Sequence, residues 1–180
     1  FFNDTATTEI YTPARHDARP SGRQVQYRRT YLNLVKSTAW QESCWRQFIR
    51  VNGRVRFLES ATDDVGMMQV NRHVWRGFYS IPRLEWDVCY NVGAGAEILM
   101  RLMNAADARP SAAGGTAVAA IARSTYAAYN GGPGAYNRWR RPDEPAQTRA
   151  IDQSFWPRFK AIAAGQLFDI LSCAAQWGHH

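Results

Sequence analysis

Histidine, cysteine and long apolar runs are scarce in this sequence, and each scarcity excludes a class of protein. No stretch of 18 apolar residues occurs among the 180 residues, so we expect no membrane-spanning helix. His73 is the only histidine between residues 24 and 165, and no cluster of cysteine, histidine and carboxylate residues has the spacing of metal ligands. The sequence therefore predicts no metal site and no other cofactor.

Lysine is scarce too, with 2 lysines beside 20 arginines, but positive charge is not. The 22 basic residues exceed the 15 acidic residues by 7, which favours an anionic partner such as nucleic acid, a membrane surface or an acidic cell-wall polymer. Charge alone does not choose among these. With 46% hydrophobic and 13% aromatic residues, the sequence has enough apolar material for one substantial core, which predicts a single domain.

The first residues differ in character from the rest of the sequence. Residues 3–12 resemble the translation of a sequencing-library adapter, so we expect residues 1–23 to lie outside the fold. No signal peptide is visible, and we expect any targeting segment to have been lost upstream. Residues 24–165 are then expected to form the domain, and residues 166–180 a C-terminal helix and tail.

Apolar residues recur at helical spacing in several segments, which predicts a mainly helical domain. Asn52 and Gly53 are expected to end the first helix. A polar loop over residues 54–65 should follow, with a short extended piece at 55–58, and it would form one wall of a cleft. Asn71 is expected to cap a short helix. The long helices are expected at residues 25–48, 87–103, 116–130 and 149–164.

Glu42 is a carboxylate at a position where the first predicted helix should be apolar. It falls inside a stripe that includes Val35, Trp45 and Ile49. Apolar surroundings disfavour the charged form of a carboxyl group and raise its pKa, which suits a general acid that works near neutral pH. The alternative is a glutamate at the edge of the stripe that reaches water, and this stretch by itself does not decide between the two.

Three further polar side chains lie within or at the ends of apolar segments. Gln69 is in the compact turn 66–70, where a buried amide would need partners and could bind a sugar or a carboxylate. Tyr129 brings a hydroxyl to the end of an apolar stripe, and its alternative role is a structural bond to the backbone. Asn91 lies near the start of a predicted helix and is either a cleft residue or part of the helix entry.

Four motifs occur in the order that is found in one enzyme family. They are Gln41-Glu42-Ser43, Gly66-Met67-Met68-Gln69 with Ser60 six residues before it, Asn91-x-x-x-Gly95, and Ala128-Tyr129-Asn130-Gly131-Gly132-Pro133-Gly134. Over residues 28–140 the sequence resembles the soluble lytic transglycosylase catalytic domain, a bacterial peptidoglycan-cleaving domain with a goose-type-lysozyme-like fold. Met67 stands where that family usually has leucine, and the loop between Glu42 and Gly66 is longer than is common there.

The resemblance implies a role for each of these residues. Glu42 matches the catalytic acid/base, while Ser60, Gln69 and Tyr129 match positions that bind substrate or support the acid. Asn91 matches a further family position, which we also assign to substrate binding. The implied reaction cleaves the β-1,4 bond between N-acetylmuramic acid and N-acetylglucosamine and closes a 1,6-anhydro ring, so one carboxylate suffices. Glycosidases that use water ordinarily need two.

Other functions fit parts of the sequence. Asp63 or Asp64 could act as the base of a lysozyme-type hydrolase of the same bond, and a peptidoglycan-binding module without catalysis is a further alternative. Residues 138–141 form a basic and aromatic patch that could bind nucleic acid. No recognition motif accompanies this patch, so we expect no nucleic-acid partner.

The resemblance also implies a location and a partner. We expect the domain to act on peptidoglycan glycan strands in the periplasm or cell envelope, and the sequence leaves open whether it belongs to a larger envelope complex. Disulfides form in such an oxidising compartment. The three cysteines, Cys44, Cys89 and Cys173, are therefore expected to give one disulfide and one free thiol, with the pair left open.

Overall fold

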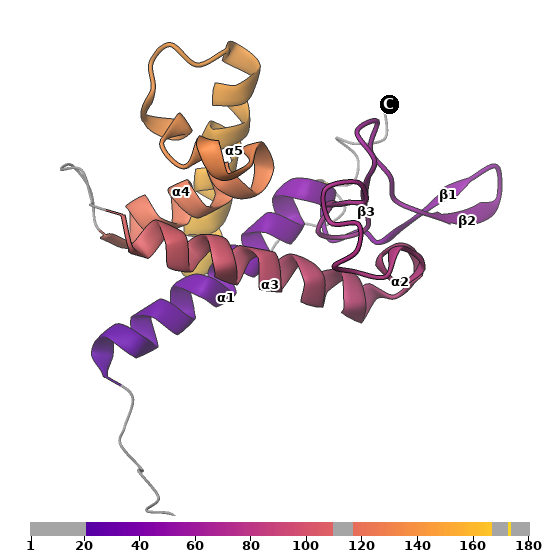
Figure 1. The fold of residues 1–180 in the computed structure, drawn as a ribbon, viewed down its shortest axis with the longest axis horizontal. Helices are drawn as coiled ribbons and strands as arrows, with labels where there is room; N and C mark the ends of the chain where they lie inside the picture. The colour runs from indigo at the N-terminus through magenta and orange to yellow at the C-terminus, as the bar shows by residue number, and fades with distance from the viewer. Residues whose placement is uncertain (1–20, 110–116, 167–172, 174–180) are drawn as a thin grey trace, which may run out of the picture.

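The computed structural model describes residues 21–109, 117–166 and 173, which form a mainly helical domain (Figure 1). This confirms the predicted fold class. Residues 1–20, which make up most of the segment expected to lie outside the fold, are outside the described residues, and so is the predicted C-terminal helix apart from Cys173. Within the described ranges, none of the helices combines the length and the apolar character needed to cross a bilayer.

The first helix, α1 (Gly22–Ser43), begins and ends where local chemistry fixes it. Ser21 and Gln24 form a reciprocal capping box, in which each side chain accepts a hydrogen bond from the backbone N–H of the other. This cap lies three residues before the predicted domain start at residue 24. The helix ends earlier than predicted because Cys44 and Trp45 take left-handed backbone conformations, with φ of 52° and 56°.

A β-hairpin replaces the predicted continuation of this helix. It consists of β1 (Phe48–Val51) and β2 (Arg54–Phe57), and Figure 1 shows it projecting away from the helices. The pattern predicts a helix stop at Asn52 and Gly53, but both have positive φ, at 50° and 77°, and form the two-residue turn that suits antiparallel strands. The extended piece predicted at residues 55–58 is confirmed as β2.

A second, shorter hairpin pairs β3 (Asp64–Val65) with β4 (Val70–Asn71) and encloses the compact apolar turn between them. Asn71 then accepts hydrogen bonds at Oδ1 from the backbone N–H groups of His73 and Val74, as a helix cap would. The short helix predicted after Asn71 does not form, because turns occupy this stretch instead.

The remaining long helices begin and end within four residues of their predicted bounds. The elements are α2 (Ile81–Trp86), α3 (Val88–Asp107), α4 (Ala117–Gly131) and α5 (Ala146–Ala163), with 3₁₀ turns η1 (Pro133–Ala135) and η2 (Arg138–Arg140). Asp87 caps α3 by accepting a hydrogen bond from the backbone N–H of Tyr90. Gly95 in α3 allows a close approach, since a Cβ there would lie 2.5 Å from the Cβ of Met68.

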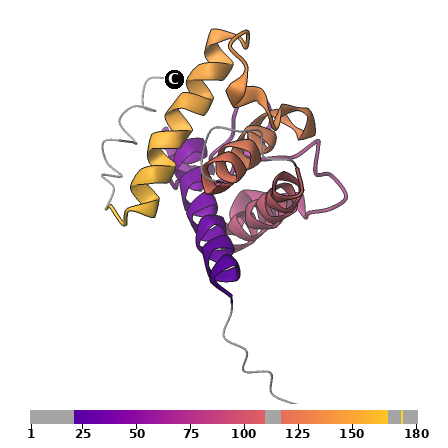
Figure 2. The ribbon, with the colours of Figure 1, turned by 90° about the vertical axis from the view of Figure 1, so that its left-hand side faces the viewer.

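The helix α1 lies between α5 on one side and α3 and α4 on the other (Figure 2), and it contacts all three. One apolar cluster joins α1 to α4 and α5 through Leu34, Tyr126 and Phe155. A second cluster contains Met68 and Leu99 and joins the compact turn to α3. Because α1 is packed from several directions, the position of its last turn is set by tertiary contacts.

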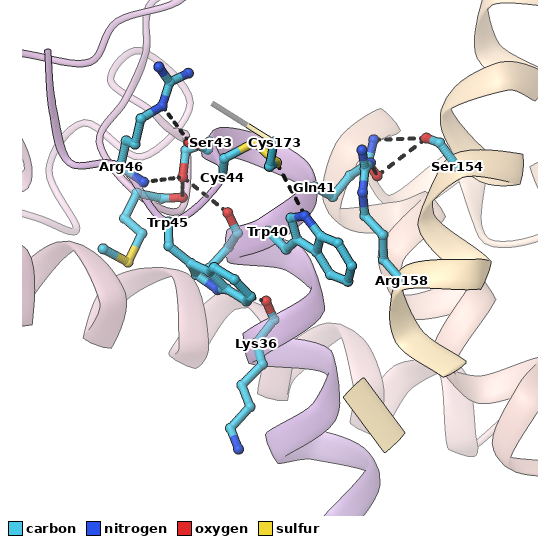
Figure 3. The surroundings of a disulfide bond; sticks show 12 residues. Lys36, Trp40, Gln41, Ser43, Cys44, Trp45, Arg46, Ser154, Arg158 and Cys173 are labelled. Carbon is cyan, nitrogen blue, oxygen red and sulfur yellow. Dashed lines mark hydrogen bonds between the residues drawn. A yellow bond between two sulfur atoms is a disulfide. The ribbon is translucent and has the colours of Figure 1, made fainter. Parts of the chain in front are cut away.

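A disulfide joins Cys44, directly after α1, to Cys173 (Figure 3). Cys89 is free and exposed, so the prediction of one disulfide and one free thiol is confirmed, and the structure supplies the pair. The indole N–H of Trp40 donates a hydrogen bond to Cys173 Sγ at 3.2 Å. The cross-link therefore fastens residue 173 to the end of the helix that carries Glu42.

We predict that Cys173→Ala lowers the free energy of unfolding by about 2–5 kcal/mol, because a cross-link between residues 129 positions apart strongly restricts the unfolded chain. Chemical denaturation of the oxidised protein and the variant measures the difference. Cys89→Ala is the matched control and should change stability by less than about 0.5 kcal/mol. Alkylation of the unfolded, unreduced protein should modify Cys89 alone, and three modified thiols would contradict the pairing.

Candidate active site

Glu42 lies in the last turn of α1, one residue before the helix ends. The phenolic hydroxyl of Tyr126 in α4 donates a hydrogen bond to Glu42 Oε1 at 2.8 Å. Glu42 keeps some exposed surface, so the residue is held from one side without being sealed from solvent. Trp45 and Ile49 lie beyond the helix, so their predicted place in its apolar stripe is wrong.

The surroundings of Glu42 favour its protonated form. Removal from water raises the pKa of Glu42 from its ordinary 4.5 to about 7, and the negative charge of Asp64 acts in the same direction. The hydrogen bond from Tyr126 and the positive charges of Arg138 and Arg158 oppose this rise, because they stabilise the carboxylate. A carboxyl group with a pKa near 7 can donate a proton at neutral pH and then take one back as a base.

Tyr126 is a site residue that the sequence pattern does not single out. It is 1% exposed, and its ring stacks on Phe155 with centroids 3.9 Å apart and planes 5° apart. Burial, and then the charge of Glu42, raises the pKa of Tyr126 well above 10, so its hydroxyl stays protonated and donates to the carboxylate. Tyr126 lies three residues before Tyr129 on the same helix face, and that spacing is the signal that could have found it.

The turn at residues 66–69 is fastened to the two helices beside Glu42. The hydroxyl of Ser43, at the end of α1, donates to the backbone carbonyl of Met67 at 2.6 Å. The hydroxyl of Tyr129, near the end of α4, donates to the backbone carbonyl of Met68 at 2.7 Å. Tyr129 therefore makes the structural hydrogen bond to the backbone that the sequence left open as its alternative role.

Tyr129 and Gln69 are brought to the same turn. Burial, followed by the charges of Glu42 and Asp64, raises the pKa of Tyr129 well above 10, so its hydroxyl stays protonated and lies within electrostatic reach of the glutamate. Gln69 is half-buried, has a left-handed φ of 49°, and donates from Nε2 to the carbonyl of Gly66 at 2.8 Å. The structure thus gathers Glu42, Tyr129 and Gln69 around one loop, and their contacts with substrate stay predictions.

Asn91 lies beneath this turn and has no exposed surface. Its Oδ1 accepts a hydrogen bond from the backbone N–H of Met68 at 2.8 Å, and its Nδ2 donates to backbone carbonyls. Gln47, which the sequence pattern does not reveal, accepts from the N–H of Met67 at 2.8 Å. A Cβ on Gly66 would lie 2.3 Å from Asn91 Nδ2 and 2.5 Å from Gln47 Oε1. Asn91 therefore supports the turn from below and has no surface with which to bind a substrate.

Ser60 belongs to a hydrogen-bond network around Asp64. Its hydroxyl donates to Asp64 Oδ2 at 2.9 Å, while Thr62 Oγ1 and Asn71 Nδ2 donate to the same carboxylate at 2.5 and 2.9 Å. The charge of Asp64 raises the pKa of Glu42, so this network lies within electrostatic reach of it. The structure therefore links Ser60 to the site through Asp64, and its role in substrate binding stays a prediction.

Asp63 is held in surface ion pairs. Its carboxylate forms an ion pair with Arg72 at 2.6 Å and a hydrogen bond with His73 Nε2 at 3.1 Å, and the hydrogen bonds from these two residues hold the pKa of Asp63 below its usual range. Glu59 and Glu85 pair with the same Arg72. In the described part of the chain, no three histidine, cysteine or carboxylate side chains are grouped so that they could hold a metal ion.

Arg138, the first residue of the basic patch predicted at residues 138–141, is buried. Arg138 is 7% exposed, and its guanidinium donates two hydrogen bonds to the carboxylate of Asp152, at 2.7 and 2.9 Å. A third hydrogen bond goes to Asn130 Oδ1 at 3.1 Å. Arg138 is therefore part of a buried ion pair near Glu42 and is not available to a nucleic acid.

Fold and site together define a lysozyme-like helical domain built around one glutamate. The transglycosylase SLT domain family matches residues 22–151, and the chain belongs to that family. Comparisons with curated proteins and with solved structures found no match. Family membership confirms the resemblance and the fold class, and it indicates transglycosylase chemistry on peptidoglycan.

The raised pKa of Glu42 gives stability a pH dependence of defined sign. The folded-state pKa of about 7 exceeds the ordinary 4.5. The contribution of Glu42 to the free energy of unfolding is therefore greatest below pH 4.5 and is lost as pH rises through 7. We predict that the unfolding free energy of the wild type, relative to Glu42→Gln, falls across this window in urea denaturation. Glu97→Gln removes an exposed carboxylate whose pKa Arg101 lowers, and it should show no such fall. A flat difference for Glu42→Gln would contradict the shifted pKa.

Tyr126→Phe keeps the ring on Phe155 and removes only the hydroxyl. The carboxylate of Glu42 then loses a donor, so we predict that its pKa rises further and that the loss of stability moves to higher pH. The free energy of unfolding should fall by about 1.5–3 kcal/mol at pH values where Glu42 is ionised in the folded protein. Tyr136→Phe is the control, since this buried hydroxyl donates to Leu102 at 3.3 Å instead. An unshifted titration in Tyr126→Phe would show that its hydrogen bond does not act on the carboxylate.

Proposed function

We propose that this domain is a lytic transglycosylase that cleaves the β-1,4 bond between N-acetylmuramic acid and N-acetylglucosamine and leaves 1,6-anhydro ends. The observation that carries the proposal is Glu42, a half-buried carboxyl group with a pKa of about 7 that Tyr126 holds in a domain of the SLT family. Peptidoglycan glycan strands are the proposed substrate. The residues supply the chemistry without a cofactor.

In the first step, Glu42 donates its proton to the glycosidic oxygen. The bond from that oxygen to C1 of the muramic acid residue breaks, and N-acetylglucosamine leaves as an alcohol. The N-acetyl group of the muramic acid residue assists at C1. Because Tyr126 donates to Oε1, Oε2 is the oxygen that carries the proton to the substrate.

In the second step, the same carboxyl group acts as a base. The Glu42 carboxylate takes the proton of the C6 hydroxyl, and the C6 oxygen bonds to C1 of the same sugar. The ring closes without water, and Glu42 returns to its protonated form. An intramolecular hydroxyl avoids the entropic cost of recruiting a nucleophile. Between the steps, Tyr126, Arg138 and Arg158 stabilise the carboxylate.

Hydrolysis of the same bond is the second candidate, with Asp64 as the base that activates water. One observation favours it, namely that the charge of Asp64 acts on Glu42. However, both carboxylate oxygens of Asp64 already accept hydrogen bonds, Oδ2 from Ser60 and Thr62 and Oδ1 from Asn71, so Asp64 is engaged by the protein and not poised to bind a water. The single-carboxylate reaction therefore fits the site better.

The residues of the turn have different proposed roles. Gln69 is half-buried, and beyond the hydrogen bond from its Nε2 to Gly66 its amide has a further N–H and an oxygen to offer a sugar, whereas the single hydroxyl proton of Tyr129 goes to the carbonyl of Met68. We therefore assign substrate binding to Gln69, and to Ser60 beside Asp64, and assign Tyr129 to fixing the turn.

We also propose a location in the periplasm or cell envelope, where the substrate lies. The disulfide between Cys44 and Cys173 supports this location, because disulfides persist in oxidising compartments.

Digestion of purified peptidoglycan tests the proposed reaction. We expect the wild type to release muropeptides with anhydro ends, each lighter by one water than a hydrolysed reducing end. Activity should fall as pH rises through about 7, because the acid form of Glu42 is then lost. Reducing ends alone would identify a lysozyme-type hydrolase, and salt-sensitive DNA binding without cleavage would remove the assignment.

Glu42→Gln tests the catalytic residue itself. The amide keeps the shape of the side chain but delivers no proton, so we predict a loss of about 10² to 10⁴ in rate with the fold intact. Glu97→Gln is the control, because it removes an exposed carboxylate on α3 that pairs with Arg101. Full activity in Glu42→Gln would overturn the assignment.

A further inference from the structure

Three neighbours of Glu42 come from three different elements. Gln41 precedes it in α1, Tyr126 in α4 donates to its carboxylate, and the charge of Arg138 in η2 acts on it. Each of these neighbours is held by a residue of α5. The family match ends at residue 151, so these α5 residues lie outside it.

The α5 residues are spaced three apart, which places them on one face of the helix. The contacts are Asp152 with Arg138, Phe155 with Tyr126, and Arg158 with Gln41. One face of α5 therefore contacts three of the residues that neighbour the carboxyl group of Glu42.

The contact between Phe155 and Tyr126 is an almost parallel stack. Both residues are 1% exposed, and the ring centroids lie 3.9 Å apart with 5° between the planes. The hydroxyl of Tyr126 can stay 2.8 Å from Glu42 Oε1 only while the ring keeps this position. Phe155 thus determines where the donor to the carboxylate lies.

The contact between Arg158 and Gln41 fixes the last turn of α1 (Figure 3). Gln41 donates from Nε2 to Ser154 Oγ at 3.0 Å, and the Arg158 guanidinium donates to Gln41 Oε1. The guanidinium also lies 5.5 Å from the ring centroid of Trp40. The residues directly before Glu42 are therefore held by α5.

We propose that Phe155 and Arg158 are positioning residues for Glu42, and that this face of α5 belongs to the catalytic apparatus. Phe155 acts through Tyr126, and Arg158 acts through Gln41 in addition to its charge, which stabilises the carboxylate through space. The inference rests on the proposed role of Glu42 as the acid.

The test follows the titration of Glu42 through protein stability. For each variant, the free energy of unfolding is measured across pH with Glu42 present and with Glu42→Gln, and the difference between the two curves gives the titration. The charged and titratable groups that act on or face Glu42 are Asp64 on β3, Tyr126 and Tyr129 on α4, Arg138 on η2 and Arg158 on α5. Phe155→Leu changes none of these groups. A shift of the Glu42 titration in that variant therefore reports the position of Tyr126.

We expect Phe155→Leu to move the titration of Glu42 to higher pH and to add no further shift in a Tyr126→Phe background. Phe159→Leu is the matched control, because Phe159 is buried in the same helix, stacks on Trp156 at 5.4 Å and touches Phe155 only in a tilted contact at 6.1 Å. It should lower the melting temperature comparably without moving the titration. An unshifted titration in Phe155→Leu, or an equal shift in Phe159→Leu, would overturn the role of Phe155.

Arg158→Met should lower kcat by about tenfold to a hundredfold with little change in KM, because misplacing a catalytic group costs rate more than binding. Arg158→Lys keeps a charge and a donor for Gln41, and should recover most of the rate. Gln41→Met keeps the charge of Arg158 and should lose part of this rate, and the double variant should lose no more than Arg158→Met. Additive losses, or no recovery by lysine, would overturn the role of Arg158.

The two proposals can fail separately. If the wild type cleaves no peptidoglycan, the proposed function fails, while the stability-derived titration still tests whether Phe155 positions the donor to Glu42. If the wild type cleaves but Phe155→Leu and Phe159→Leu behave alike, only the inference about Phe155 fails.

Discussion

The carboxyl group of Glu42 is largely removed from water, and much of the described structure compensates for that. A desolvated carboxylate is costly unless donors and positive charges stabilise it. Among the described residues, the hydroxyl of Tyr126 donates directly to the carboxylate, and the guanidinium groups of Arg138 and Arg158 act through space. Their combined effect leaves the pKa near 7 instead of restoring the ordinary value, so neither protonation state dominates at neutral pH. This balance suits a group that must give and take a proton in one cycle.

The turn at residues 66–69 shows a second constraint, which is that backbone groups withdrawn from water need partners. Asn91 and Gln47 bind its N–H groups from below, and the hydroxyls of Ser43 and Tyr129 bind its carbonyls from the helices. The loop that carries Gln69 is therefore fixed relative to Glu42 by side chains from α1, α3, α4 and the segment after α1. Polar residues that look like substrate contacts in a motif can thus serve the loop instead, as Asn91 does.

The sequence by itself determined the features that depend on neighbours along the chain. Helical periodicity predicted the mainly helical fold and the bounds of α3, α4 and α5 to within a few residues. The motifs predicted the family and singled out Glu42, Gln69 and Tyr129, which the structure gathers around one loop. Prediction from local sequence failed where the same residues are typical of two different structures. The Asn52 and Gly53 pair fits both a helix stop and a hairpin turn, and the positive φ values show that it is a turn.

Only the tertiary structure decided which distant residues meet. Tyr126 is 84 positions from Glu42, and Arg138 pairs with Asp152 across two elements, so no periodicity along the chain could reveal these contacts. The pairing of Cys44 with Cys173 spans 129 positions and was equally open. The physical reason is that spacing along one helix determines which face a residue occupies, whereas the partner of that face depends on how the helices pack. The sequence thus singled out Glu42, and the packing of α1, α4 and α5 decided its pKa and its orientation.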